Sequence, residues 1–202
     1  NVLTGKDTRV LLRGIGLESP VNVSVYRLGE RLLAFGEQGL PWELDPETLE
    51  TRGRFTFGDR LNPLSPFSAH PAFDARTGEM FNFGVSFSAE RPCLNFYRFD
   101  RSATLVYRRR LPLEAPTSIH DFGLSPTLAT VYVSPHLVSM ERLLSGSSLL
   151  EALDWRPERG SQLLVLDRET GDERCRIDIG SGYCLHLIDT FERGDLLLVD
   201  VL

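Results

Sequence analysis

The sequence predicts an all-β protein built from consecutive antiparallel hairpins, and three observations support this. Short apolar runs alternate with tight turns along most of the chain. An apolar residue and an aspartate precede a polar turn and a returning strand at Asp45, Asp74, Asp100 and Asp167. Strands do not alternate with helices, as they would in a parallel sheet. A sandwich and a β-propeller both satisfy this pattern, and the loose repetition of four-stranded units favours the propeller.

The predicted strands follow one another in chain order. They are residues 31–35, 42–44, 52–57, 80–87, 104–109 and 173–179. In the first hairpin, Pro46 presets the turn dihedral and Asp45 caps the turn; residues 192–195 form a further turn. Residues 137–153 break the pattern, because their apolar residues have mixed helical spacing, and we expect a short helical insertion there.

Composition limits the classes of function. The 202 residues are 42% hydrophobic and 25% charged, which excludes collagen-like and disordered chains. The net charge is −6 and Lys6 is the only lysine, so we expect no nucleic-acid partner. No apolar run approaches the roughly 18 residues that would span a bilayer.

Cysteine usage suggests a cellular compartment, and the two chain ends suggest a fragment. An odd count of three cysteines fits a reducing compartment, so we expect a cytoplasmic protein. The chain starts at Asn1 and stops at Leu202 inside an apolar, strand-like run. We therefore expect residues 1–202 to be a piece of a longer protein, forming a single partial propeller domain.

Three of the four histidines occur in similar settings. His70, His120 and His186 are each flanked by apolar residues and belong to different predicted hairpins. In a propeller, the innermost strands point residues at a central axis, so these imidazoles could converge on one divalent transition metal. The alternative is three unrelated histidines that bond to backbone groups, and spacing alone does not decide between the two. His136 follows a proline at a strand end and is expected at the surface.

The segments around these histidines carry a family resemblance. Residues 68–71 (SAHP), 118–122 (SIHDF) and 184–192 (CLHLIDTFE), with 29–37 (GERLLAFGE) and 44–51 (LDPETLET) upstream, resemble the carotenoid cleavage oxygenase family in order and spacing. That family includes stilbene-cleaving oxygenases and the retinoid isomerase of the visual cycle. The resemblance implies a seven-bladed propeller, of which this chain covers the central blades and lacks the first and last.

The resemblance also implies a metal site. The family holds one axial non-haem iron(II), Fe²⁺, with four histidines, and the first three ligands correspond to His70, His120 and His186. The fourth would lie beyond Leu202. Glu37 corresponds to a glutamate that orients a ligand histidine, here His120, although it could instead be an exposed acid at a strand end. Asp121 is expected to cap a turn rather than to bind metal.

The resemblance further implies a dioxygenase that splits a carbon–carbon double bond with O₂ to give two carbonyl products. Val23 corresponds to a residue over the remaining coordination position. Stilbene-cleaving members carry a lysine directly before the glutamate, where this chain has Gly36, so we favour an apolar, apocarotenoid-like alkene. The sequence of residues 184–188 nevertheless resembles the stilbene-cleaving branch more closely, and a stilbenoid-cleaving enzyme is the alternative within the family.

Further residues and rival functions complete the prediction. Ser118, Phe122 and Leu185 are expected to line the substrate site, and the simpler interpretation places them in the core. An inert propeller that serves as a binding module is the rival from another class, and an isomerase or hydrolase on the same metal is a third. An apolar substrate suggests peripheral contact with a membrane for its uptake, but no suitable amphipathic helix is visible.

Overall fold

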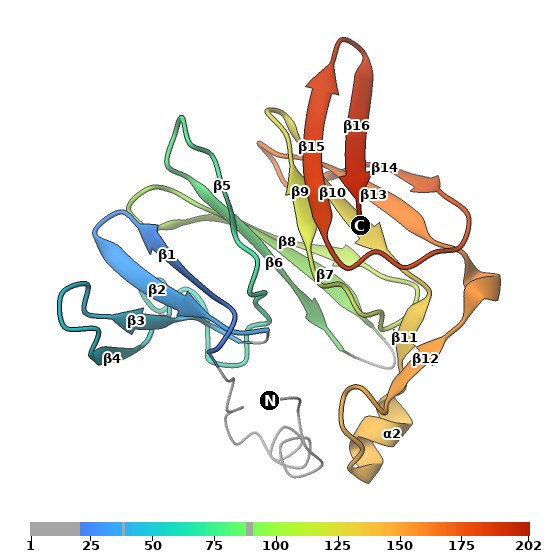
Figure 1. Cartoon of the computed structure of the whole chain (residues 1–202), viewed down its shortest axis with the longest axis horizontal. Helices are drawn as coiled ribbons and strands as arrows, with labels where there is room; N and C mark the ends of the chain where they lie inside the picture. Colours follow the sequence, from blue (N-terminus) through green and yellow to red (C-terminus); the bar gives the residue numbers. More distant parts are fainter. Residues whose placement is uncertain (1–20, 38, 88–90) are drawn as a thin grey trace.

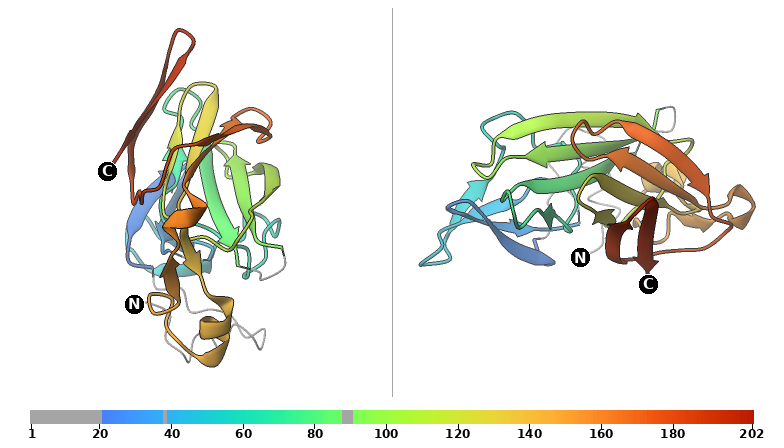
Figure 2. Two further views of the ribbon diagram at one scale, coloured as in Figure 1. Left: turned by 90° about the vertical axis from the view of Figure 1, so that its right-hand side faces the viewer. Right: turned by 90° about the horizontal axis from the view of Figure 1, so that it is seen from above.

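The chain folds into antiparallel sheets that follow one another in chain order (Figures 1 and 2). The computed structural model describes residues 21–37, 39–87 and 91–202. Within this part of the chain there are three four-stranded sheets and two two-stranded sheets. None of the helices described there is long and apolar enough to cross a bilayer.

The first two sheets are simple meanders, in which each strand pairs with the next. The strands of the first sheet are β1 (Ser24–Leu28), β2 (Arg31–Phe35), β3 (Trp42–Leu44) and β4 (Thr51–Arg54). Those of the second are β5 (Ala72–Phe73), β6 (Met80–Ser86), β7 (Cys93–Phe99) and β8 (Leu105–Pro112). Sequential pairing of this kind is what the recurring hairpin turns predict.

The third sheet contains an excursion between its second and third strands. Its strands are β9 (Phe122–Leu124), β10 (Leu128–Val133), β13 (Gln162–Asp167) and β14 (Glu173–Asp178). The excursion contains β11 (His136–Val138), α2 (Met140–Ser145), β12 (Leu153–Trp155) and the 3₁₀ turn η1 (Pro157–Arg159). The last hairpin is β15 (Leu187–Arg193) with β16 (Leu196–Val201).

The helical insertion expected over residues 137–153 is present but shorter. Only α2 is helical. The residues on either side of it form strands β11 and β12, which pair with each other. Ser139 caps the helix by accepting a hydrogen bond from the Arg142 N–H, and Gly146 ends it in the left-handed region at φ 103°. Cross-strand pairing therefore outcompetes helical spacing at both ends of the segment.

Strands β6 and β7 of the second sheet are buried on both faces, which fixes how neighbouring sheets pack. Met80 of β6 packs toward the first sheet, whereas Phe81 and Phe83, on the alternate face, pack toward the third. In β7, Phe99 packs toward the first sheet and Phe96 packs toward the third. The continuous apolar sequence of β6 and β7 is therefore the signature of a strand between two cores.

The predicted turn aspartates cap their hairpins. The Oδ1 atoms of Asp45, Asp74, Asp100 and Asp167 each accept a backbone N–H two to four residues further on, at 2.8–2.9 Å. These short-range bonds hold the returning strand in place without help from distant residues. The prediction of hairpin turns at these positions is confirmed.

The first strands of successive sheets, β5, β9 and β15, lie next to one another, and we call them inner strands. Strand β9 contacts both β5 and β15. The sheets thus fan out from a shared edge, as blades of a β-propeller do. This confirms the predicted propeller architecture for the part of the chain that the structure describes, and the total of seven blades rests on the family resemblance.

Gly123 allows β15 to pack directly on β9. A Cβ atom at this position would lie 1.8 Å from Oγ1 of Thr190 and 2.7 Å from Oγ1 of Thr130. Both threonines are buried, and their hydroxyl oxygens are 3.2 Å apart. A side chain at position 123 would therefore push the two inner strands apart.

Replacing Gly123 with alanine should lower the free energy of unfolding by about 1–3 kcal/mol, because overpacking forces neighbours to shift. The change would be measured by chemical denaturation. The double variant Gly123→Ala/Thr190→Ala removes the nearest clashing atom and should recover part of the loss. Equal stability of Gly123→Ala and the wild type would contradict this description of the contact.

Candidate metal centre

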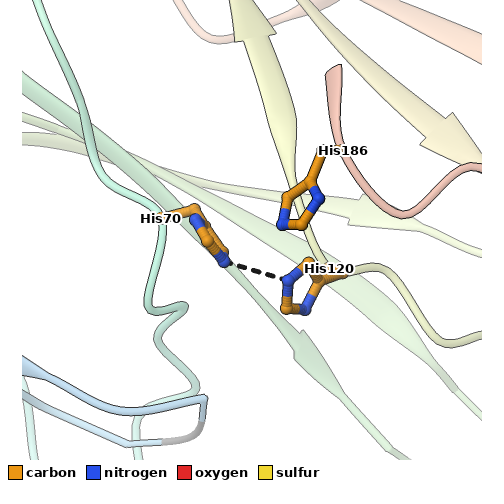
Figure 3. A group of neighbouring side chains, drawn as sticks. All are labelled: His70, His120 and His186. Carbon is orange, nitrogen blue, oxygen red and sulfur yellow. Dashed lines mark hydrogen bonds between the residues drawn. The ribbon is translucent and has the colours of Figure 1, made fainter. Parts of the chain in front are cut away.

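Each predicted ligand histidine stands directly before an inner strand. His70 and His120 lie two residues before β5 and β9, and His186 lies one residue before β15. Because the inner strands meet at a common edge, their starting ends bring residues from three sheets together (Figure 3). The prediction that these side chains converge is correct.

The three imidazoles lie close enough to share one ion. Nε2 of His70 and Nε2 of His120 are 2.9 Å apart, and one nitrogen of each of the three rings lies within 4.8 Å of the others. The ring centroids are 4.5–5.3 Å apart. Among the described residues, this is the cluster of side chains that could hold a metal ion.

Buried polar groups fix the loop that carries His70. The amide of Asn82, a fully buried residue of β6, accepts a hydrogen bond from the Ser68 N–H and donates one to the Ser68 carbonyl, both at 3.0 Å. The Ser68 hydroxyl accepts the His70 N–H at 3.0 Å. From the first sheet, the Ser24 hydroxyl donates to the Ala69 carbonyl at 2.6 Å. The backbone of His70 is therefore held from two sheets.

Asp121 joins the loops of His120 and His186. Its carboxylate accepts the N–H of Phe122 at 2.8 Å and that of Leu187 at 3.1 Å, which places the residue after His120 against the residue after His186. The expected capping role is confirmed. The bond across to Leu187 was not predicted, because the two residues are 66 positions apart.

Glu37 contacts His120, the ring that it is predicted to orient. Its Oε2 lies 3.1 Å from Nδ1 of His120. A neutral imidazole that donates from Nδ1 presents an unprotonated Nε2, which is the atom that faces His70. The side chain of Glu37 is 48% exposed, so this acid is at once a partner of His120 and partly solvated.

The histidines experience opposite electrostatic effects. The hydrogen bond to Glu37 raises the pKa of His120 above its ordinary value of 6.5. Burial lowers the pKa of His70, and the neighbouring His120 lowers it further. His70 therefore favours the neutral form that a metal ligand requires, and His120 gains a partner that fixes its tautomer.

The arrangement fits a divalent transition metal. Nitrogen ligands lie about 2.1 Å from such an ion, so two adjacent ligands are about 3 Å apart. The separation between His70 and His120 matches this spacing. The contact is equally compatible with a hydrogen bond between a protonated and an unprotonated nitrogen. An all-imidazole donor set suits iron, copper, nickel and zinc and does not by itself select one of them.

The predicted lining residues differ in position. Gly36 and Phe122 are buried, and Phe122 packs edge-on against Phe83 and Phe96 in the core between the second and third sheets. Val23 directly precedes β1 and is 41% exposed, and Leu185 is 39% exposed. Ser118 is half-buried and its N–H donates to the His136 carbonyl. The lining role of these residues stays a prediction.

His136 is not a member of the cluster. It is half-buried in β11, between the rings of Trp155 and Tyr183 at 6.1 and 5.4 Å. The expectation that it lies at the surface is therefore only partly met. Sequence reasoning also missed Asn82, whose position within an apolar strand is a signal that a buried polar group is needed there.

Comparison with known proteins agrees with this geometry. The sequence profile of a family described as RPE65, retinal pigment epithelial membrane protein, matches residues 4–202. The chain belongs to this family. Its members include the carotenoid cleavage oxygenases, so the resemblance inferred from the histidine segments is confirmed.

Relatives in the RPE65 family come from several branches. Isoeugenol monooxygenase of Pseudomonas putida is 32% identical over 183 residues, which cover 90% of this chain and 37% of that protein. Resveratrol cleavage oxygenase 1 of Aspergillus fumigatus is 34% identical over 155 residues, covering 75% and 30%. The chain thus spans well under half the length of these relatives.

Solved structures of the RPE65 family show the same fold. A mutant of the Synechocystis apocarotenoid oxygenase matches with a TM-score of 0.83 and 25% identity, over 92% of this chain and 40% of that one. A cobalt-substituted form of the Synechocystis enzyme matches with a TM-score of 0.81 and 25% identity, over the same shares.

Replacing Glu37 with glutamine should lower the pKa of His120 in the metal-free protein, because it removes the main cause of the raised value. A raised pKa stabilises the fold below the unfolded value of about 6.5, and this stabilisation is lost as the pH rises through the folded value. The variant should therefore lose more stability at about pH 6 than at about pH 8.

Nuclear magnetic resonance titration of the His120 ring, with denaturation at both pH values, measures these effects. Glu30→Gln is the matched control, because Glu30 lies in the turn between β1 and β2, its side chain is almost fully exposed, and its ion pair is with Arg27. An unchanged His120 pKa in Glu37→Gln would contradict the assigned contact.

Proposed function

We propose that the full-length protein is a non-haem iron dioxygenase that cleaves a carbon–carbon double bond of an apolar conjugated alkene with O₂. The products are two carbonyl compounds. The observation that carries this proposal is the convergence of His70, His120 and His186 from three inner strands. Relatives named as carotenoid, apocarotenoid and resveratrol oxygenases support the reaction type, and the relative described as cobalt-substituted supports a metal in a protein of this fold.

The chain's own residues would prepare the site. His70, His120 and His186 would hold one Fe²⁺ per intact chain, and the resemblance implies a fourth histidine beyond Leu202. Ferrous iron in such a site supplies the activation of dioxygen toward an electron-rich double bond. Glu37 keeps the proton on Nδ1 of His120 and so directs Nε2 toward the metal. No acid or base is needed at the alkene itself.

Val23 would limit access of water to the remaining coordination position. It directly precedes β1, just as His186 directly precedes β15. Its branched apolar side chain offers no hydrogen-bond donor or acceptor. A site that excludes water strengthens electrostatic interactions and protects reactive species from side reactions.

Two substrate classes are candidates, and the observations divide between them. Gly36, the buried residue before Glu37, has no side chain that could bind a phenolate, which favours an apocarotenoid-like alkene. The similarity to isoeugenol monooxygenase and resveratrol cleavage oxygenase favours a phenolic alkene as the second candidate. Ser118, Phe122 and Leu185 would be the first residues to vary in a search for selectivity.

The setting of the reaction is also a proposal. We place the enzyme in the cytoplasm, where its three free cysteines would stay reduced. Peripheral contact with a membrane would give an apolar alkene a route to the site, and the reaction calls for no nucleic acid.

Replacing His120 with alanine should abolish both metal binding and alkene cleavage, because it removes one ligand and the partner of Glu37. Metal content by elemental analysis should fall well below about one iron per chain, because a site that has lost a ligand binds its ion more weakly. His136→Ala is the matched control and should keep its iron. A His120→Ala variant with the same iron content as the wild type would contradict the proposal.

Incubation with ¹⁸O₂ should place labelled oxygen in both carbonyl products, which are trapped by reduction before their oxygen exchanges with water.

An apocarotenal should be cleaved faster than isoeugenol or resveratrol if Gly36 governs selectivity, and the reverse order would select the phenolic class. Double-bond rearrangement without oxygen uptake would identify an isomerase. A protein that binds neither iron nor any of these alkenes would be the inert binding module.

A further inference from the structure

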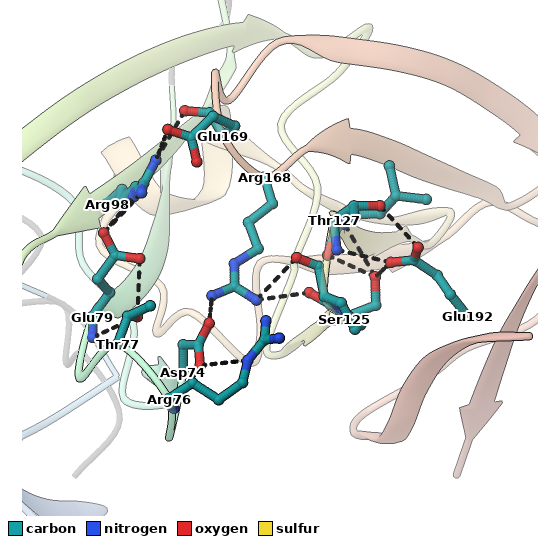
Figure 4. A network of polar contacts seen from close by, with 12 residues as sticks. Asp74, Arg76, Thr77, Glu79, Arg98, Ser125, Thr127, Arg168, Glu169 and Glu192 are labelled. Carbon is teal, nitrogen blue, oxygen red and sulfur yellow. Dashed lines mark hydrogen bonds and ion pairs between the residues drawn. The ribbon is translucent and has the colours of Figure 1, made fainter.

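A polar network, in which Asp74, Ser125 and Arg168 are buried, joins the far ends of the inner strands that follow the histidines (Figure 4). Asp74 directly follows β5, Ser125 directly follows β9, and Glu192 lies near the end of β15. The ligand histidine precedes each of these strands, and the network residue lies at or directly after its other end. We call Asp74, Ser125, Thr127, Arg168 and Glu192 the clasp.

Arg168 is the centre of the clasp. Its guanidinium pairs with the carboxylate of Asp74, and it also donates to the carbonyl of Ser125 at 2.9 Å. Arg168 and Asp74 are 8% and 7% exposed, so both charges lie inside the protein. The planar fork of an arginine can serve both acceptors at once, which a lysine ammonium does less well.

Glu192 brings the third inner strand into the clasp. Its carboxylate accepts hydrogen bonds from the Ser125 hydroxyl at 2.5 Å, the Thr127 N–H at 2.8 Å and the Thr127 hydroxyl at 2.9 Å. Thr127 is fixed in turn, because its carbonyl accepts the Arg168 N–H at 2.9 Å. The turn between β9 and β10 therefore connects Arg168 on one side to Glu192 on the other.

Hydrogen bonds favour the ionised forms of the two acids of the clasp. Burial alone would raise the pKa of Asp74, but hydrogen bonds from the Arg76 N–H and from Arg168 hold it at about 2. Hydrogen bonds led by that of Ser125 lower the pKa of Glu192. Burying an ion pair brings little net stability, so its presence is better explained by the geometry it imposes.

Two of the inner strands, β5 and β9, are short, so their own pairing fixes them weakly. Strand β5 has two paired positions with β6, and β9 has three with β10. Asp74 lies four positions after His70, roughly 13 Å of extended chain. A shift at the clasp end of such a strand is therefore carried to its histidine end.

We propose that Arg168 is a positioning residue for the metal centre. Through Asp74 it sets the place of β5, and through Ser125 and Thr127 it sets the places of β9 and β15. The spacing of the three histidines follows from the spacing of these strands. The inference rests on the metal site of the proposed function, and it adds a residue that lies at the opposite end of the inner strands from that site.

The test compares metal binding in full-length, metal-free proteins titrated with cobalt(II), whose absorption bands report coordination geometry. Arg168→Met should weaken cobalt affinity about tenfold, the lower end of what loss of a supporting contact costs a metal site, and should shift the bands. Arg168→Lys keeps the charge and should recover part of the affinity. Glu192→Ala, which breaks the link to β15, should act in the same direction.

Glu169→Gln is the matched control. Glu169 is the neighbour of Arg168 and makes an ion pair with Arg98 of β7 at 2.8 Å, so it also links the second and third sheets. That pair touches no inner strand. Its loss should leave cobalt affinity and the absorption bands unchanged.

Thermal unfolding measured in parallel separates positioning from general stability. The inference would be overturned if the Arg168→Met variant melts at a lower temperature but binds cobalt with unchanged affinity and an unchanged spectrum. If that variant fails to fold with Asp74 left unpaired, Asp74→Asn/Arg168→Met removes both charges and the same criterion applies to it. Equal losses in Glu169→Gln would also overturn it.

The result also separates this inference from the proposed function. Weakened cobalt binding in Arg168→Met, together with a wild type that binds cobalt but cleaves no alkene, would support the clasp and reject the dioxygenase. A wild type whose cobalt binding does not depend on His120 would overturn both.

Discussion

The metal centre depends on how closely the first strand of each sheet packs against the first strand of the next. Gly123 makes this approach possible between β9 and β15, because even a methyl group would overlap Thr190. The approach brings His120 and His186 to a ring separation of 4.9 Å. Each histidine stands within two residues of its strand, so little chain is free to absorb an error in strand position.

Polar groups inside the protein serve this packing rather than oppose it. Asn82 in the middle of β6 is fully buried, and its amide makes a donated and an accepted hydrogen bond to Ser68. Asp121 accepts N–H groups from both sides of the contact between two sheets. A buried polar group without partners would be costly, and each of these has partners that also determine where a histidine loop lies.

The two ends of the inner strands carry different kinds of chemistry. At the starting ends, burial favours a neutral His70, and Glu37 fixes the orientation of His120. At the finishing ends, hydrogen bonds from the Arg76 N–H and from Arg168 lower the pKa of Asp74, which pairs with Arg168. Neutral ligands suit a cation, whereas a buried ion pair gives directional contacts between sheets. The inner strands thus join the histidine cluster at one end to a network of ion pairs and hydrogen bonds at the other.

The sequence by itself determined the hairpins, the candidate ligands and the family. Asp45 and Asp100 cap turns through bonds that span two to four residues, and such local chemistry can be read from a short segment. The three histidines stand out by their flanking residues, and the family resemblance assigns Glu37. Only the tertiary structure decided that Asp121 reaches Leu187 and that Arg168 pairs with Asp74, 94 positions away. Contacts at such distances depend on how whole sheets pack, and a linear pattern of residues does not specify that geometry.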